Sequence, residues 1–149
     1  MITVSDLNCK EENYTWWLNI MPDEMPRLSI LPKEVRIQLD YSPASLDVLE
    51  MYIRKNYTMD EMKDRKNRFA RDLFARYIGE TLRRNAPGLY WSFDTEDDQS
   101  PFYGVPVLLT LGQEDEVPPM TPSLWVVSVI EKSEESFLRD QLEQVKKAA

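Results

Sequence analysis

Histidine is absent from this 149-residue chain, and the only cysteine is Cys9. Without histidine, the chain cannot form the Ser–His and Cys–His pairs of many nucleophilic enzymes, nor a histidine-containing zinc site. A single cysteine rules out an intramolecular disulfide and favours a cytoplasmic location. Because the sequence around Cys9 offers no activating base, we interpret this residue as an unreactive thiol near the N-terminus.

Glycine and long apolar runs are also scarce. The chain has 4 glycines, and none of them stands in a phosphate-binding pattern. No apolar run is long enough to cross a bilayer, and the first residues have neither the basic region nor the apolar core of a signal peptide. These absences predict a chain without a cofactor and without membrane association.

Acidic residues exceed basic ones by 26 to 18, which gives a formal net charge of −8. Nucleic acids and anionic membranes are poor partners for such a chain, whereas a basic protein is compatible with it. Excess acid also keeps ordinary proteins soluble, so the charge alone does not identify a partner.

The stretch from Thr58 to Trp91 predicts a long helix that runs directly into a strand. Thr58 and Glu61 form a capping box at its start. Residues 87–88, Pro-Gly, end the helix, and alternating apolar residues then predict a strand at 88–94. The apolar face of the helix consists of Phe69, Ala70, Leu73, Phe74, Tyr77, Ile78 and Leu82. Acid–base pairs at i,i+4 spacing are Glu61/Arg65, Asp64/Arg68, Asp72/Arg76 and Glu80/Arg84.

A cluster of five residues joins the end of this helix to the strand: Gly79, Glu80, Arg83, Arg84 and Trp91. Glycine inside a good helix costs close to 1 kcal/mol relative to alanine, so Gly79 indicates the close approach of another element. Glu80 can pair with either arginine. We interpret the cluster as a structural corner between helix and strand. A polar recognition patch beside Trp91 is the functional alternative.

The remaining segments give a coarse order of elements. Alternation at 35–39 predicts a half-buried strand, and Ser42-Pro43 predicts the start of a helix that ends near Asn56. Further strands are predicted at 102–111, with Pro106 at an edge or bulge, and at 123–130. Ser133 is expected to cap a last helix with Leu138, Leu142 and Val145 inward.

These elements predict a single domain over residues 1–149. Consecutive strands with no room for crossover helices must pair antiparallel. We therefore expect a two-layer α+β fold, in which an antiparallel sheet of three to four strands packs with a long central helix and a C-terminal helix. Residues 1–33 are irregular and are expected to dock on the core. Trp16 and Trp17 are either covered by that docking or exposed as an anchor for a partner.

Two acidic loops are the candidate binding residues. The loop after the strand at 88–94 lacks the ligand order of a calcium site, so no metal site is predicted there. The second loop lies between Gly112 and Pro122 and is rich in proline. The candidate partner-binding residues are Asp94, Glu96, Asp97, Asp98, Glu114, Asp115 and Glu116.

Two stretches carry a resemblance to a known class of proteins. They are residues 39–46, Leu-Asp-Tyr-Ser-Pro-Ala-Ser-Leu, and residues 77–91, from Tyr-Ile-Gly-Glu through Arg-Arg-Asn to Trp. This pattern resembles small uncharacterised bacterial domains, some of which are similar to immunity proteins of toxin systems. It covers about a third of the chain and implies no catalytic residues. Trp16, Trp17 and the 112–122 loop lie outside it.

Three functions are compatible with these observations. The first is a non-enzymatic, cytoplasmic, immunity-like domain that occludes a basic protein with its acidic loops. The second is a small acidic chaperone-like adaptor, a homodimer that holds an extended client segment on an apolar face. The third is an enzyme that works with carboxylates, which requires acids converging in a concave pocket.

Overall fold

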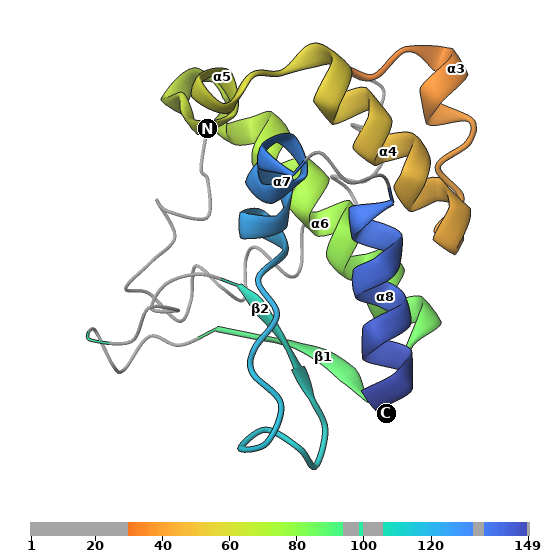
Figure 1. The fold of residues 1–149 in the computed structure, drawn as a ribbon, viewed down its shortest axis with the longest axis vertical. Helices are drawn as coiled ribbons and strands as arrows, with labels where there is room; N and C mark the ends of the chain where they lie inside the picture. Colours follow the sequence, from red (N-terminus) through yellow and green to blue (C-terminus); the bar gives the residue numbers. More distant parts are fainter. Residues whose placement is uncertain (1–29, 94–98, 100–105, 133–135, 149) are drawn as a thin grey trace.

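A computed structural model describes residues 30–93, 99, 106–132 and 136–148 of the chain (Figure 1). The described residues form an α+β fold of six α-helices and a two-stranded antiparallel sheet. The expected docking of residues 1–33 falls largely outside them, as do Trp16, Trp17 and Ser133. The elements are α3 (Lys33–Arg36), α4 (Pro43–Asn56), α5 (Met59–Lys63), the 3₁₀ turn η2 (Arg65–Asn67), α6 (Arg68–Asn85), β1 (Leu89–Ser92), β2 (Val107–Thr110), α7 (Pro122–Glu131) and α8 (Phe137–Ala148).

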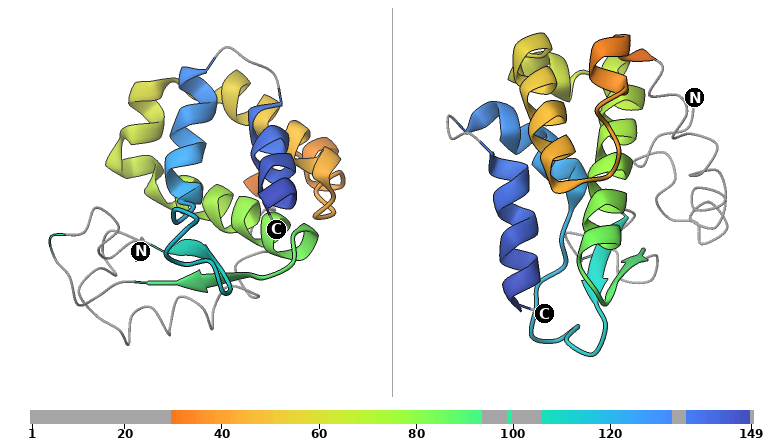
Figure 2. Two further views of the ribbon diagram at one scale, coloured as in Figure 1. Left: turned by 60° about the horizontal axis from the view of Figure 1, so that its bottom comes forward. Right: turned by 90° about the vertical axis from the view of Figure 1, so that its right-hand side faces the viewer.

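The helices form the larger part of the described fold, and α6 lies at its centre. Helix α7 packs on α6, α8 packs on α4, and β1 turns back beside the C-terminal half of α6, where Trp91 packs on Gly79 (Figures 1 and 2). One hydrophobic core connects these elements. No helix among the described residues is both long enough and apolar enough to span a membrane.

Helix α4 begins as its sequence predicts. The hydroxyl of Ser42 accepts a hydrogen bond from the backbone N–H of Ser45, and Pro43 occupies the first helical position. This caps one of the N–H groups that every helix start leaves without a partner. The helix buries Leu46, Leu49 and Ile53 completely.

The predicted long helix is interrupted. Thr58 and Glu61 form the expected capping box, but Asp64 has an extended backbone (φ −66°, ψ 139°) and ends α5. The carboxylate of Asp64 then accepts a hydrogen bond from the N–H of Lys66, 3.0 Å away, within the 3₁₀ turn. Such local bonding by an Asp side chain competes with a continuous helix. The central helix α6 therefore starts only at Arg68.

Five residues of the predicted apolar face of α6 are at most 1% exposed, namely Leu73, Phe74, Tyr77, Ile78 and Leu82, whereas Phe69 and Ala70 are half-buried. Two of the predicted acid–base pairs are present, Asp72–Arg76 at 2.9 Å and Glu80–Arg84 at 3.6 Å.

Two predicted strands are wrong, because one segment forms the end of a short helix and a turn and the other is a helix. The segment 35–39 overlaps α3, where Pro32 precedes the first turn and its carbonyl accepts the N–H of Arg36 at 2.9 Å. Ile37, expected to face inward, is 69% exposed. Proline suits the start of a helix, and this local signal outweighs a short alternation of apolar residues.

The segment 123–130 is helix α7. Pro122 occupies its first turn. Val126 and Val129 are completely buried, whereas Leu124 is 61% exposed. Burial therefore follows the helical spacing of three residues and not the alternation that a strand requires. Periodicity alone does not distinguish a short apolar strand from a buried helix.

The sheet is consequently smaller than expected, with two strands in the described part of the chain. Leu89 pairs with Thr110 and Ser92 pairs with Val107 in antiparallel register. Gly88 adopts a positive φ of 83°, which turns the chain from α6 into β1. On the edge of β2 away from β1, Leu108 forms an isolated antiparallel bridge with Met120, where a third strand was expected.

A buried carboxylate fixes the start of α8. Glu50 of α4 is 2% exposed, and its carboxylate accepts the backbone N–H groups of Phe137 at 3.1 Å and Leu138 at 2.7 Å. Arg54 lies 3.1 Å from the same carboxylate. An acid at a helix N-terminus satisfies free N–H groups and complements the helix dipole. Leu138 and Leu142 are fully buried, as predicted.

Candidate protein-interaction site

The residues of the predicted corner lie together in the structure. A Cβ atom built on Gly79 would lie 2.2 Å from one ring carbon of Trp91, so the indole packs directly on the helix backbone. The indole Nε1–H of Trp91 donates to the Glu80 carboxylate at 2.9 Å. Arg83 donates to both oxygens of that carboxylate, at 2.8 and 3.0 Å.

The electrostatics of the corner favour an ionised Glu80. Burial raises the pKa of Glu80, but the hydrogen bonds from Arg83 and Trp91 and the charges of Arg83 and Arg84 outweigh burial, so that its pKa lies below the usual value. The guanidinium of Arg84 also lies 3.8 Å above the ring of Tyr41. The charged groups of the corner thus pair with one another, which supports a structural role for the corner.

Tyr41 connects this corner to the start of α4. It has a positive φ of 62°, which is uncommon for a residue other than glycine. Its ring stacks on Tyr77 at 4.9 Å, its N–H donates to the Tyr77 hydroxyl at 2.9 Å, and its carbonyl accepts from Asn85 at 2.8 Å. These contacts hold Tyr41 in the left-handed conformation and join α4 to α6.

Of the two candidate acidic loops, the structure describes the one between β2 and α7. Glu114, Asp115 and Glu116 are all exposed there. The hydroxyl of Tyr90 donates to the Glu114 carboxylate at 2.9 Å, which lowers the pKa of Glu114 and raises the pKa of Tyr90. No ion pair neutralises the three carboxylates within the described residues. Asp94, Glu96, Asp97 and Asp98 lie outside the described residues.

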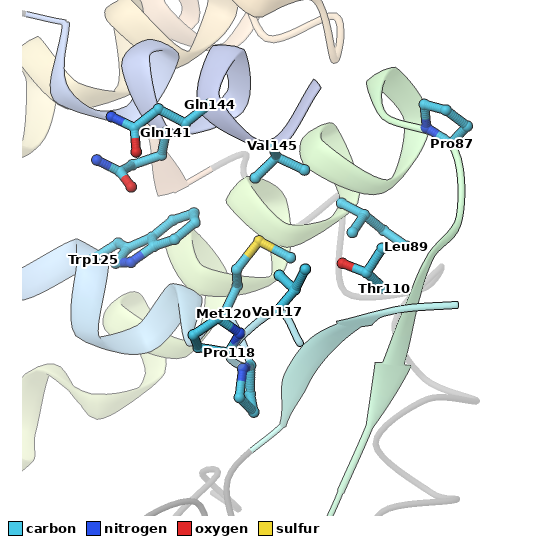
Figure 3. Close-up of a pocket in the computed structure, with 11 residues that line it drawn as sticks. Pro87, Leu89, Thr110, Val117, Pro118, Met120, Trp125, Gln141, Gln144 and Val145 are labelled. Carbon is cyan, nitrogen blue, oxygen red and sulfur yellow. The ribbon is translucent and has the colours of Figure 1, made fainter. Parts of the chain in front are cut away.

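An apolar pocket of about 340 Å³ lies next to this loop (Figure 3). It is formed where the hairpin, the proline-rich end of the loop, α7 and α8 meet. We call it the Trp125 pocket. Its lining consists of Pro87, Leu89, Thr110, Val117, Pro118, Pro119, Met120, Trp125, Gln141, Gln144 and Val145.

Three polar side chains of the Trp125 pocket come from its helical side, and Thr110 of β2 adds a hydroxyl from the other. Figure 3 shows Trp125, Gln141 and Gln144 on one side of the pocket and Leu89 and Thr110 on the other. The indole N–H and the two side-chain amides form no hydrogen bond with any residue that the structure describes. They are available to a bound molecule.

Sequence reasoning did not find this pocket. Its residues come from five separate segments, and Trp125 was assigned to a strand. Only Pro118-Pro119, directly after the acidic residues, marked the region as unusual, because consecutive prolines present apolar surface without backbone donors.

A second, wider groove of about 550 Å³ lies between α3 and α4. Met51, which is 71% exposed, and Val48 contribute apolar surface to it, and Glu34 and Lys55 contribute charge. This groove is the apolar face that the adaptor hypothesis would use.

The described residues offer little catalytic machinery around these sites. They contain no group of three or more histidine, cysteine, aspartate and glutamate side chains placed to hold a metal ion. The Trp125 pocket has no carboxylate among its lining residues, so it does not provide the converging acids of the enzyme hypothesis.

Comparison with known proteins adds no relative: no family model, no curated protein and no solved structure matches the chain.

Proposed function

We propose that this chain is a non-enzymatic, cytoplasmic protein-binding domain that acts like an immunity protein, by occluding a basic partner. The observation that carries the proposal is the position of Glu114, Asp115 and Glu116. They are exposed, and they directly precede the residues Val117 to Pro119 that line the Trp125 pocket. Negative charge and an open apolar surface thus occur side by side.

The two parts of this surface have different tasks in binding. The pocket supplies apolar area and one aromatic anchor, the kind of surface from which most interface energy comes. The acidic loop supplies rim charge, which chiefly raises the association rate and excludes partners of the wrong charge. The net charge of −8 acts in the same direction at longer range.

The second acidic group, Asp94, Glu96, Asp97 and Asp98, belongs to the proposal on sequence grounds. The strand that precedes it, β1, ends at Ser92 opposite Val107, at the start of β2, whereas the 114–116 loop follows the other end of β2. The chain enters the proposed complex as a monomer or a homodimer, and neither nucleic acid nor a membrane takes part in it.

The test is an affinity capture from extracts of the source organism at low and high salt. The key variant carries Glu114→Lys, Asp115→Lys and Glu116→Lys. A matched control carries Glu34→Lys, Asp60→Lys and Glu131→Lys, three exposed acids elsewhere with the same total change of charge.

We expect a basic partner that binds the wild type and the control at low salt, binds the loop variant weakly, and dissociates at high salt. Surface charges are screened beyond about 8 Å at physiological ionic strength, so an electrostatic contact must be sensitive to salt. A partner that binds the loop variant and the control equally well would refute the acidic face as the site.

A further inference from the structure

We infer that the Trp125 pocket binds an extended, proline-containing segment of the partner with a basic residue beside it. This inference rests on the proposed function, because it names the part of the basic partner that the domain holds. It follows from the hydrogen-bonding groups in the pocket, from its walls, and from the charges next to it.

The free polar groups of the pocket supply donors in particular. The indole of Trp125 is a donor only, and each glutamine amide carries two N–H donors besides its carbonyl. These three side chains form one side of the pocket (Figure 3). A ligand that satisfies them must present exposed acceptors, such as backbone carbonyl groups.

The rest of the lining is mostly apolar and offers few backbone donors. Three of the lining residues are prolines, which have no N–H, and Leu89, Val117 and Val145 add aliphatic surface. A bound segment therefore combines free carbonyls with apolar side chains that are rigid enough to pack against an indole.

Two common forms of peptide do not meet this requirement. The carbonyls of a bound helix are already used within the helix, apart from those of its last turn. A bound strand would need a free sheet edge here, but Met120 occupies the edge of β2 at the pocket. Leu108 N–H donates to the Met120 carbonyl at 2.9 Å, and Met120 N–H donates to the Leu108 carbonyl at 3.0 Å.

A polyproline II segment meets the requirement. It has no internal hydrogen bonds, so its carbonyls are free, and its backbone is already ordered before binding. Docking of such segments in aromatic-lined grooves is a known mode of peptide recognition. The volume of about 340 Å³ is near the lower limit of ligand pockets, which suits a short anchor.

The acidic residues next to the Trp125 pocket predict the kind of residue that flanks the docked proline. Glu116 and Val117 are neighbours in the chain, and the N–H of Val117 donates to the Gln113 carbonyl at 2.8 Å in the turn that presents them. A lysine or arginine next to the docked proline would therefore meet the carboxylates of the acidic loop.

The test uses synthetic peptides and the full-length ¹⁵N-labelled chain. The probe is acetyl-Lys-Pro-Pro-Leu-Pro-Pro-Lys-amide. One control replaces all four prolines with alanine and keeps both lysines, and a second control keeps the prolines and replaces both lysines with glutamate. Binding is followed by NMR titration of the Trp125 indole and the Gln141 and Gln144 side-chain signals.

We expect the probe to shift these side-chain signals and the alanine control to bind about tenfold more weakly, because it loses a preordered backbone. Trp125→Phe, which removes the indole donor and keeps an aromatic ring, and Gln144→Ala, on an exposed position, should each weaken the probe. Gln38→Ala removes an amide from the turn after α3, outside the Trp125 pocket, and should not weaken the probe.

The outcomes separate the two proposals. If the probe and the alanine control bind equally well, and neither binds the 114–116 charge-reversed variant, the proline segment is wrong and the basic partner stands. If the glutamate control binds as tightly as the probe, the pocket assignment stands and the basic partner is wrong. If the probe leaves the signals of Trp125, Gln141 and Gln144 unshifted, the pocket assignment is wrong.

Discussion

Replacing Gly79 with alanine should destabilise the protein, although the same change in an ordinary helix is favourable. Gly79 lies within α6, where alanine is preferred by close to 1 kcal/mol. Its added Cβ, however, would lie 2.2 and 2.4 Å from two ring carbons of Trp91. The indole would have to move away from the helix.

The size of the effect follows from three contributions. Overpacking of this kind costs about 1–3 kcal/mol. Movement of the indole also lengthens its 2.9 Å hydrogen bond to the Glu80 carboxylate, and a hydrogen bond to a charged group contributes about 1.5–3 kcal/mol. After subtraction of the gain in helix propensity, we expect a net loss of about 2–4 kcal/mol.

The assay is urea unfolding followed by circular dichroism, on the wild type, Gly79→Ala, Trp91→Ala and the double variant. In the Trp91→Ala background the clash is absent, so Gly79→Ala should raise the free energy of unfolding by about 1 kcal/mol. The effect of Gly79→Ala on the free energy of unfolding is thus expected to change from destabilising to stabilising.

Two results would refute this reasoning. A stabilising Gly79→Ala in the wild-type background would mean that Trp91 does not rest on the helix backbone. A Gly79→Ala that remains destabilising after removal of the indole would place the clash at another residue.

Two further predictions concern buried carboxylates. Glu50→Ala removes the acceptor of two α8 N–H groups and the carboxylate that pairs with Arg54. We expect the free energy of unfolding to fall by about 3–5 kcal/mol and amide hydrogen exchange at Leu138 to become faster. Unchanged exchange at Leu138 would contradict the role of Glu50 as the cap of α8. Glu80 has a lowered pKa in the folded state, so its stabilisation is present above the unfolded value of about 4.5 and is lost as pH falls through the folded pKa. The urea midpoint of the wild type should therefore decrease below pH 4.5, and Glu80→Gln should make this decrease smaller. The same decrease in both proteins would show that Glu80 does not contribute to it.

Local signals in the sequence predicted the elements whose ends are fixed by their own residues. The Ser42-Pro43 start of α4, the Thr58–Glu61 capping box and the turn at Gly88 each depend on groups within a few positions of each other. Such features are readable because their physics is local.

The two wrong strands show the limit of periodicity. In 35–39 the apolar residues alternate, and in 123–130 they run on continuously. Neither pattern determines the backbone conformation or which side chains contact other helices. Pro32 and Pro122, which precede or begin the helices, are the local signals that favour a helix in each segment.

The candidate site was predicted in part. The acidic residues 114–116 were identified from composition, whereas the Trp125 pocket was not, because α8 reaches it only through tertiary packing. Gly79 did indicate a close approach, since a glycine within a strong helix pattern costs stability unless a neighbouring element needs the space of its missing side chain.

The carboxylate of Glu50 also has a consequence for synthesis of the chain. Its two helix donors lie as many as 88 residues downstream. At about 5–20 residues per second, a ribosome needs roughly 4–18 s to produce them. During that interval the α4 surface that later contacts α8 remains uncovered, with an acid at its centre. Helix α8 therefore completes this part of the core only after Phe137 and Leu138 have been translated.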